Sequence, residues 1–402
     1  MGEAIVGEPI QGVAEAARSK IPLSKIGYSV LLLYLLFFLI SLVMVFSTTE
    51  VLSYAQRGGN TWYYLGRQVM TFAVGFVLML AVSLGRPSFY RRFDVLGVVL
   101  MLGLLLLTLK FGIMEKGARR ALSVFGLFKI RPAEIASVPL IIYLSSYFSN
   151  EKNDLRTLRG VLTPVLVVGA FVGVVVVNSL SQALVLAVVG GVMLLMGRVR
   201  WLHMVLIVLL GAGGLAGYQA WSYQKTIHAE ERGEATGREA TDRSKTRYNR
   251  FERWLNGTEL QTEQSKMAIA SGVAIGRGPG RNQLCSLLPE SYSDFIFSII
   301  VEEYGLPGAA VVMILYLVLL WRIFAVLKSS DNRYMQMVCG GVGVTIAVQV
   351  LIHVMVGVGF MPVTGITLPL ISHGSTSLVV VSVLLGLVLS VNREIIDEKV
   401  PR

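Results

Sequence analysis

Ten long apolar runs, separated by short stretches with Gly, Pro or charged residues, constrain this chain more than any other feature. They cover residues 26–46, 68–85, 94–110, 132–149, 160–178, 181–197, 201–220, 294–327, 335–358 and 368–391. A helix needs roughly 20 apolar residues to cross a bilayer core, and the runs approach or exceed that length. Open sheets cannot satisfy their backbone in lipid, and these runs lack the alternation of barrel strands. The sequence therefore predicts an all-α, polytopic membrane bundle of about ten transmembrane helices.

The composition agrees with this fold class and excludes several others. Hydrophobic residues make up 54% of the chain and charged residues 15%, with a mean hydropathy of +0.66. That is more apolar surface than one soluble core can bury. The formal net charge is +11, but the cations are spread over many short loops, which argues against a nucleic-acid partner. The two cysteines, Cys285 and Cys339, cannot build a disulfide framework or a thiolate metal site.

The distribution of Lys and Arg predicts the orientation, because basic residues near helix ends tend to stay cytoplasmic. With the N-terminus inside, every inner segment carries two or three cations, and an even helix count places the C-terminus inside as well. We expect a cytoplasmic tail over residues 1–25, a membrane domain over 26–391 and a second cytoplasmic tail over 392–402. The run 26–46 is too long for a signal peptide and lacks a small-residue cleavage site, so we expect it to remain as the first helix.

Two segments on the predicted outer face break the charge rule. Residues 110–131 contain six cations: Lys110, Lys116, Arg119, Arg120, Lys129 and Arg131. Residues 221–293 form a polar loop of about 70 residues, far longer than a helix connection needs. A basic rim beside a long loop suits an anionic substrate in the outer leaflet, such as a lipid pyrophosphate. The alternative is a solvated basic face that contacts anionic lipid headgroups.

The end of the long loop places three acids on one predicted helix. Ser293 suits a helix N-cap, so we expect Asp294 in the first turn at the outer membrane surface, near the positive end of the helix. A simple helix-start carboxylate is the alternative to a catalytic one. Glu302 and Glu303 lie more than two turns deeper along the helix. Acids at that depth are candidates for function.

Two polar segments combine backbone-breaking residues with charge. Residues 276–281 (GRGPGR) are glycine-rich and basic, which permits a phosphate-cradling turn or a plain flexible turn. No Lys-Ser/Thr pair follows, so a nucleotide site is not predicted. Residues 131–134 (RPAE) suit a helix start, with Pro132 in its first turn and Glu134 near its positive end.

Polar residues also interrupt the last two apolar runs. Gln349 and His353 are one helical turn apart and should share a face directed into the bundle, where hydrogen bonds between helices are their expected role. Pro362, Gly365 and Pro369 precede a polar stretch, 372–377 (SHGSTS). Irregular backbone at membrane depth is stable inside protein or along a wet cavity. We therefore expect this broken start of the last helix to line a site.

These stretches together resemble the SEDS family (shape, elongation, division and sporulation) of bacterial peptidoglycan glycosyltransferases. The likeness is greatest to the FtsW division branch, with RodA as the sister branch, and spans nearly the whole chain. The motifs that carry it are 117–120 (GARR), 131–134 (RPAE), 264–266 (QSK) with 276–280 (GRGPG), 293–297 (SDFIF), and 361–365 (MPVTG) with 368–377 (LPLISHGSTS).

The resemblance implies polymerisation of lipid II, an undecaprenyl-pyrophosphate disaccharide-pentapeptide, into glycan strands on the outer face of the inner membrane. It places Asp294 at the family's essential loop aspartate, which is proposed to take the proton from the acceptor hydroxyl. We expect cations to neutralise the pyrophosphate during an inverting displacement. The expected substrate-binding residues are Arg119, Arg120, Lys129, Glu134, Lys266, Arg277, Gln349, His353, Ser372, Thr376 and Ser377.

The resemblance also implies partners and a location. The expected partners are a class B penicillin-binding protein, which is a single-pass transpeptidase, and other membrane proteins of the division machinery. The expected location is the bacterial inner membrane at the division septum. A divalent cation, Mg²⁺ or Mn²⁺, is a candidate cofactor without assigned ligands. No nucleotide cofactor is expected.

Several positions depart from the family pattern. Ser137 stands where the family usually has a lysine one turn after the glutamate, so no ion pair is expected for Glu134. Residues 178–182 contain no acid where an acidic turn is common. His353 stands in place of an asparagine, and His373 and Ser375 in place of a tyrosine and a glycine.

Two other functions fit the same motifs. A lipid II flippase would also need a cavity, buried acids and a basic outer mouth, but should depend on Glu302, Glu303 or Glu134 rather than on Asp294. A non-catalytic scaffold for division proteins should tolerate Asp294→Asn.

Overall fold

The structure of the protein is a computed structural model. It describes residues 23–57, 60–115, 118–124, 128–151, 153, 157–200, 252–272, 274–282 and 291–399, together with positions 211, 213, 214, 217 and 224.

Helices dominate the described part of the chain. They are α2 (Leu23–Arg57), α3 (Trp62–Leu84), α4 (Pro87–Arg92), α5 (Asp94–Phe111), α6 (Pro132–Ile135), α7 (Ser137–Phe148), α8 (Leu158–Asn178), α9 (Leu180–Met196), α12 (Leu260–Gly272), α13 (Ser291–Asp294), α14 (Ile296–Ser329), α15 (Arg333–Gly357) and α16 (Ser375–Lys399). The predicted helical membrane fold is confirmed.

Nine of the ten predicted apolar runs coincide with helices of the described chain. Seven described helices are long and apolar enough to cross a membrane, so the protein is a multi-pass membrane protein. The run 132–149 divides into α6 and α7, and the run 181–197 corresponds to the shorter α9. The run 201–220 lies mainly outside the described residues, so the count of ten spans stays a prediction.

A small sheet interrupts the basic segment 110–131, a feature that the sequence analysis does not predict. Strands β1 (Ile113–Glu115), β2 (Ala118–Val124) and β3 (Phe128–Ile130) form an antiparallel meander in the order β1-β2-β3. Arg119 pairs with Met114 and Lys129 with Ser123. The sheet holds part of this cationic segment in a defined register.

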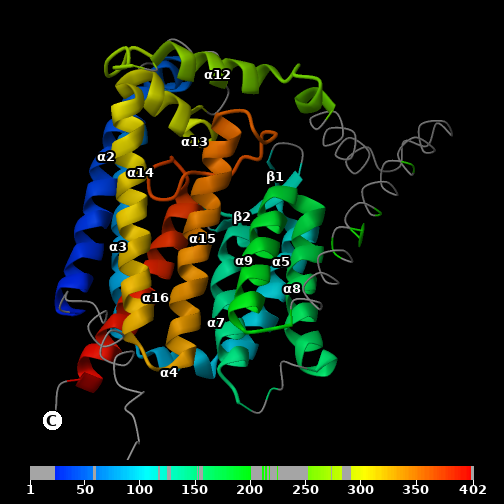
Figure 1. Cartoon of the computed structure of the whole chain (residues 1–402). Coiled ribbons are helices and arrows are strands. Elements are labelled where there is room, and N and C mark those ends of the chain that lie inside the picture. The colour runs from blue at the N-terminus through cyan, green and yellow to red at the C-terminus, as the bar shows by residue number, and fades with distance from the viewer. Residues whose placement is uncertain are drawn as a thin grey trace, which may run out of the picture.

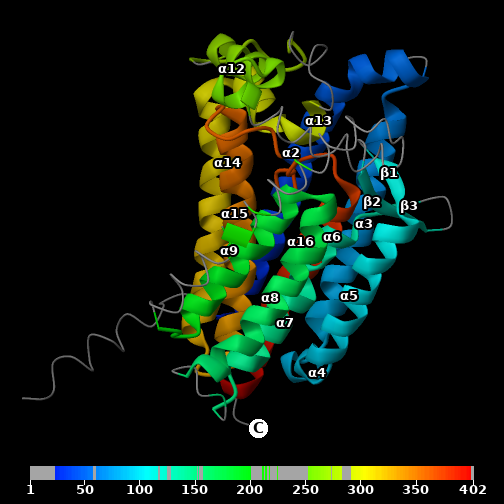
Figure 2. The ribbon, with the colours of Figure 1, turned by 90° about the vertical axis from the view of Figure 1, so that its right-hand side faces the viewer.

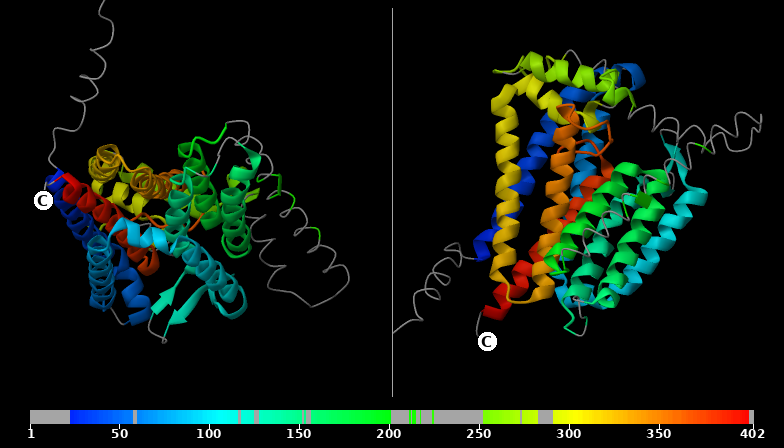
Figure 3. Two further views of the ribbon diagram at one scale, coloured as in Figure 1. Left: turned by 90° about the horizontal axis from the view of Figure 1, so that it is seen from below. Right: turned by 45° about the vertical axis from the view of Figure 1, so that its right-hand side comes forward.

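The helices form two groups that meet along the length of the molecule (Figures 1 and 3). One contains α2, α3, α14, α15 and α16, and the other contains α5, α7, α8 and α9. Helix α12 crosses one end of the first group, here called the α12 end, whereas α4 and the last turn of α16 lie at the opposite end (Figures 1 and 2). The start of α2 also lies at this opposite end (Figure 1).

Small residues allow α16 to approach α3 closely. A Cβ atom at Gly75 would lie 2.6 Å from Ser382 Oγ, and one at Gly386 would lie 2.7 Å from the carbonyl oxygen of Met79. Close backbone approach at glycines is typical of membrane helix pairs. This packing holds α16 in the interior of the bundle. The irregular segment before α16 contacts α13, and the start of α16 contacts α6.

Helix α14 is broken at Gly305, whose backbone has φ 66° and ψ −165°. Glycine tolerates this left-handed φ, and Pro307 two residues later has no N–H to continue the helical hydrogen bonds. The break separates a short N-terminal part, which carries Glu302 and Glu303, from the long membrane-spanning part.

Candidate functional site

A polar cavity opens between the two helix groups. It encloses about 720 Å³, counting its open mouth. Its lining residues come from α5, β2, the start of α6, the corner between α8 and α9, and the segment before α16: Leu105, Thr108, Arg120, Arg131, Ala133, Glu134, Val174, Val175, Asn178, Ser179, Ser181, Gln182, Thr364, Gly365 and Ile366. Segments far apart in the sequence therefore build one site.

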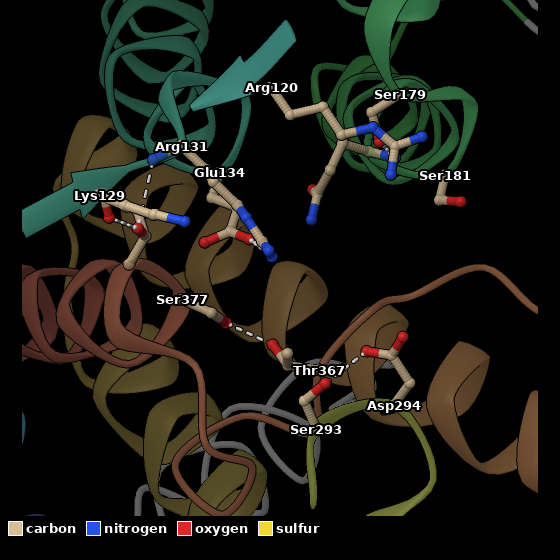
Figure 4. Close-up of polar contacts among 12 residues, drawn as sticks. Arg120, Lys129, Arg131, Glu134, Ser179, Ser181, Ser293, Asp294, Thr367 and Ser377 are labelled. Carbon is tan, nitrogen blue, oxygen red and sulfur yellow. Dashed lines mark hydrogen bonds and ion pairs between the residues drawn. The ribbon is translucent and has the colours of Figure 1, made fainter. Parts of the chain in front are cut away.

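Two arginines and one glutamate supply the charge of this cavity (Figure 4). The Arg120 side chain leaves β2 and donates from Nε to the carbonyl oxygen of Asn178 at 2.9 Å. Arg131 precedes α6 in an extended conformation, and its Nη1 lies 3.5 Å from Glu134 Oε1. The lining thus carries an excess of positive charge suited to an anion.

The ion pair of Glu134 corrects one expectation from the sequence. Ser137 cannot supply the charge of the family's lysine, and its hydroxyl donates to the carbonyl oxygen of Glu134 at 3.1 Å instead. Arg131, one turn earlier, is the partner of the Glu134 carboxylate. The cation that pairs with Glu134 therefore lies on its N-terminal side, not at position 137.

Asp294 lies at the edge of the cavity, at the end of α13. A Cβ atom built on the cavity-lining Gly365 would lie 3.5 Å from Asp294 Oδ2. Figure 4 shows Asp294 across an open space from Arg120, Arg131 and Glu134. The side chain is 8% exposed. A buried carboxylate thus lies next to a residue of a lining that contains two arginines.

The predicted N-cap role of Ser293 is wrong. Phe295 has a non-helical backbone (φ −128°, ψ 22°) and is the N-cap residue of α14, with no side-chain cap hydrogen bond. Ser293 belongs to the four-residue α13 and donates its hydroxyl to Asp294 Oδ1 at 2.8 Å. Asp294 therefore ends the turn before α14, and the N-terminus of α14 still favours a negative charge near this position.

The polar stretch before α16 anchors both sides of the cavity. Ser372 donates to the carbonyl oxygen of Ser293 at 2.8 Å and accepts from the backbone N–H of Leu368 at 2.8 Å. Thr376 donates to the carbonyl oxygen of Lys129 and accepts from the N–H of Arg131, both at 3.2 Å. Ser372 and Thr376, predicted to bind substrate, are thus engaged with the backbone that carries Asp294 and Arg131.

Ser377 and the segment before it form a further part of this wall. Ser377 accepts from the Thr367 hydroxyl at 2.8 Å (Figure 4). Ser181, from the start of α9, donates to the carbonyl oxygen of Thr364 at 2.7 Å. Gly365 has φ 70°, a left-handed conformation that favours glycine. The broken backbone predicted to line a site does line the cavity at 364–366.

His353 performs the predicted bonding between elements. Its Nδ1 lies 2.8 Å from the carbonyl oxygen of Ile366, and the N–H of Phe297 points at its Nε2 at 3.5 Å. Both contacts fit a ring whose proton is on Nδ1. His353 thereby satisfies an otherwise orphan N–H in the first turn of α14 and holds the cavity wall. Gln349 is buried, and its Oε1 has no hydrogen-bond partner among the described residues.

Four predicted substrate-binding cations lie outside the cavity lining. Arg119 donates to the carbonyl oxygen of Lys110. Lys129 is exposed on β3, and Lys266 pairs on α12 with Glu263 at 3.0 Å. Arg277 Nη1 lies 3.8 Å from Glu302 Oε1. Their predicted role stays untested, since other parts of the chain lie outside the described residues.

The glycine-rich segment is a docked turn. The N–H groups of Arg277 and Gly278 donate to the carbonyl oxygens of Glu302 and Glu303 at 2.8 and 2.9 Å. Glu303 accepts from Ser47 on α2 and from Asn282. Both glutamates are almost fully buried. These two N–H groups bind the turn to α14 just before its break at Gly305, so they are not available to bind a phosphate.

The corner between α8 and α9 supplies cavity residues that the sequence analysis did not assign: Asn178, Ser179, Ser181 and Gln182. Ser179 is the N-cap of α9 and accepts from the N–H of Gln182 at 3.4 Å. The signal in the sequence was a polar Asn-Ser-Leu-Ser-Gln interruption between two apolar runs. This interruption lacks the acid that is common in the family, but its amide and hydroxyl groups line the cavity.

Comparison with known proteins identifies similar sequences along nearly the whole chain. A family model described as "cell cycle protein" (FtsW, RodA, SpoVE) matches residues 28–396. The probable peptidoglycan glycosyltransferase FtsW of Nitrosococcus halophilus is 30% identical over 374 residues, covering 90% of each chain. Stage V sporulation protein E of Bacillus subtilis is 30% identical over 364 residues, covering 89% of this chain and 94% of its own.

Solved structures share the fold. The crystal structure of the rod shape determining protein RodA of Thermus thermophilus matches with a TM-score of 0.65 and 22% identity, over 91% of this chain and 96% of its own. A chain from a structure described as "Structural coordination of polymerization and crosslinking by a peptidoglycan synthase complex" matches with a TM-score of 0.66 and 24% identity. It is covered over 96% of its length, and 88% of this chain is covered.

Proposed function

Because this chain belongs to the FtsW/RodA/SpoVE family of cell cycle proteins, we propose that it is a peptidoglycan glycosyltransferase that polymerises lipid II. One observation carries the proposal: the Asp294 carboxylate lies at the edge of a cavity lined by Arg120 and Arg131. Relatives named as probable peptidoglycan glycosyltransferases support it.

The cavity suits a pyrophosphate linked to sugar. Guanidinium groups bind phosphate through paired, charge-assisted hydrogen bonds. Amide and hydroxyl side chains at the α8–α9 corner match the hydroxyl groups of a sugar.

An apolar groove beside the cavity suits the lipid part of the substrate. Its lining comes from α5, α6, α7 and α16: Gly97, Leu100, Met101, Leu104, Ile135, Val138, Pro139, Val379, Val380 and Val383. The cavity and the groove use neighbouring residues of the same two elements, Leu105 and Leu104 on α5, and Glu134 and Ile135 on α6. This arrangement favours an amphiphile over a free sugar phosphate.

The proposed reaction is a displacement at the anomeric carbon of one lipid-linked sugar. Asp294 takes the proton from the acceptor hydroxyl, the hydroxyl oxygen forms the new glycosidic bond, and the bond to the pyrophosphate breaks. Arg120 and Arg131 stabilise the negative charge that develops on the departing pyrophosphate. Attack opposite to the leaving group inverts the anomeric configuration.

A divalent cation does not fit a site made by the described residues alone. None of the described residues form a group of three or more His, Cys, Asp or Glu side chains that could hold a metal ion. The steps above therefore use only the side chains of the chain. The cation expected from the sequence stays a prediction.

The charge distribution supports an orientation with the α12 end outside. Arg91 lies over the ring of Tyr334, Arg333 donates to the carbonyl oxygen of Phe148, and Arg393 donates to that of Ser83. These cations gather at the end opposite to α12, and basic residues near helix ends tend to stay cytoplasmic. We place both termini in the cytoplasm and the cavity toward the outer face of the inner membrane, at the division septum.

The proposed partner is a class B penicillin-binding protein, alongside other division proteins. The fold neighbour described as part of a peptidoglycan synthase complex supports a transpeptidase partner. The matching relatives named FtsW favour division over elongation.

The flippase hypothesis receives less support. It requires acids at membrane depth along a path for the substrate, but Glu302 and Glu303 are covered by the turn at 274–282 and are absent from the lining of the described cavity. Glu134, which does line it, is paired with Arg131.

The test is reconstitution with the candidate transpeptidase and labelled lipid II. Wild type should give glycan polymer, and Asp294→Asn should reduce its rate at least 100-fold. Asp94→Asn is the matched control, because Asp94 starts α5 near the opposite end of the bundle and is expected to leave the rate unchanged. Equal polymer from wild type and Asp294→Asn would reject the catalytic role. Lipid II translocation in vesicles without any polymer would favour the flippase.

A further inference from the structure

His373 contacts two helices, α13 and α3, beside Asp294. Its backbone N–H donates to the carbonyl oxygen of Tyr292 at 3.2 Å. Its ring lies edge-on to the rings of Tyr292 and Tyr64, with centroids 5.8 and 6.4 Å apart. Its Nδ1 lies 2.8 Å from Oε1 of Gln68 on α3. The residue therefore contacts α13 through both backbone and ring, and α3 through hydrogen bonding.

The hydrogen bonds beyond Gln68 fix the direction of the whole network. Gln68 Nε2 donates to the hydroxyl of Ser41 on α2 at 2.7 Å, and this hydroxyl donates to the carbonyl oxygen of Ile371 at 2.8 Å. Since the Gln68 amide nitrogen is used toward Ser41, its oxygen faces His373 and requires a donor there. The ring proton of His373 is thus on Nδ1. The network thus links the carbonyl oxygen of Ile371 to the ring of His373 through side chains of α2 and α3.

The network is buried, so water does not readily take over its hydrogen bonds when one partner is removed. Gln68 is 1% exposed and Ser41 is fully buried. Burial and the nearby Arg67 cation lower the pKa of His373 to about 4, so the ring is neutral near pH 7. A neutral ring with its proton on Nδ1 keeps the hydrogen bond to Gln68 intact under ordinary conditions.

The turn α13 depends on such external contacts. It has four residues, and one helical turn is unstable without tertiary support. Ser372 and His373 supply that support by donating to the carbonyl oxygens of Ser293 and Tyr292. Asp294 is the next residue along the chain, so the position of its carboxylate follows the position of residues 371–373.

We propose that His373, with Gln68 and Ser41, is a positioning residue that holds Asp294 at the cavity edge by fixing residues 371–373 to α2 and α3. The proposal rests on the proposed glycosyltransferase function. His373 does not line the described cavity, and it acts through the backbone of α13 rather than on the substrate.

The test measures kcat and KM for lipid II polymerisation in the reconstituted complex. His373→Phe keeps a ring of similar size but removes the donor to Gln68, and should lower kcat at least tenfold with KM changed less than twofold. His373→Asn, which keeps a short polar donor, should restore kcat to within about threefold of wild type. Gln68→Leu should lower kcat as much as His373→Phe does. The double variant should be no slower than either single variant, because each of the three proteins lacks the hydrogen bond between His373 and Gln68.

Ser390→Ala is the matched control for general destabilisation. Ser390 is buried on α16, the helix that follows His373, and donates to the carbonyl oxygen of Gly85 at 2.6 Å, far from the start of the helix. It should lower the melting temperature without a comparable loss of kcat. If His373→Phe does not fold, Ser41→Ala is the second variant. It removes a single oxygen and with it the hydrogen bonds of Ser41 to Gln68 and Ile371, and it should lower kcat at least threefold.

The results separate this inference from the function on which it rests. The positioning role alone would be overturned by the following outcome. Wild type makes polymer and Asp294→Asn makes none, but His373→Phe and Ser41→Ala keep the kcat of wild type. Additive losses in the double variant, or a change mainly in KM, would also overturn it. Absence of polymer from wild type would instead reject the proposed function.

Discussion

The hydroxyl of Ser372 lies 2.8 Å from the carbonyl oxygen of Ser293 and 2.8 Å from the backbone nitrogen of Leu368. One buried side chain thus joins the turn before Asp294 to the segment that leads into α16. Both backbone groups would lose a hydrogen-bond partner without it.

Ser372→Ala should therefore reduce both stability and activity. Each buried backbone group left without a partner costs about 1–3 kcal/mol. We expect a lower melting temperature in detergent and a polymerisation rate reduced about tenfold. Ser382→Ala is the control, because Ser382 is buried in α16, the helix that follows Ser372, and bonds to Tyr34 away from the cavity. Equal losses of rate in the two variants would show that Ser372 contributes to stability alone.

Arg131 should determine substrate affinity more than the other cavity residues. Arg131→Gln removes a guanidinium that the proposal assigns to the pyrophosphate, and should raise KM for lipid II about tenfold. Arg131→Lys keeps the charge but loses the planar fork, so we expect a rise of only a few-fold. Arg91→Gln, at the opposite end of the bundle, should leave KM unchanged. A KM in Arg131→Gln equal to that of wild type would contradict the assignment.

Gly276 and Gly280 should respond differently to the same substitution. Both have positive φ, 84° and 73°, so alanine is strained at either position by roughly 1–2 kcal/mol. At Gly276 an added Cβ would also overlap the carbonyl group of Glu303, whereas nothing lies within 4 Å at Gly280. Gly276→Ala should therefore lower the melting temperature more and expose the turn at 274–282 to proteolysis. Similar cleavage of the two variants would contradict the docked turn.

His373 should make the protein less stable in mild acid. Its pKa is lowered from 6.5 to about 4 in the folded protein, so protonation favours the unfolded state. This contribution to stability is fully present above pH 6.5 and is lost as the pH falls from 6.5 toward 4. The loss should be about 2 kcal/mol at pH 5. Melting curves of wild type and His373→Asn between pH 7 and 5 should show a smaller decline in the variant, and parallel declines would contradict this.

Much of the helical framework could be predicted from the apolar runs, because a bilayer leaves few alternatives to the helix. The sequence could not reveal the sheet at 113–130, whose short strands lie in a basic segment without clear alternation. Gly305 and Pro307 do signal the break in α14, but the sequence analysis interpreted residues 294–327 as one continuous run.

The candidate site could be predicted in part. Asp294, Arg120 and Glu134 were recognised as single positions with plausible chemistry, and the structure brings them around one cavity. The hydrogen bonds of Ser372 and Thr376 could not be foreseen, because their partners lie about 80 and 245 positions earlier in the chain. Spacing along a sequence carries little information about such distant contacts.

Residues 364–377 touch both sides of the cavity: Gly365, Ser372 and His373 meet the α13 side, and Thr376 meets the strand and helix that bear Lys129 and Arg131. The turn that carries Asp294 and the backbone of Lys129 and Arg131 are therefore joined to the same segment. A displacement of the first turn of α16 would therefore reach the backbone on both sides of the cavity at once.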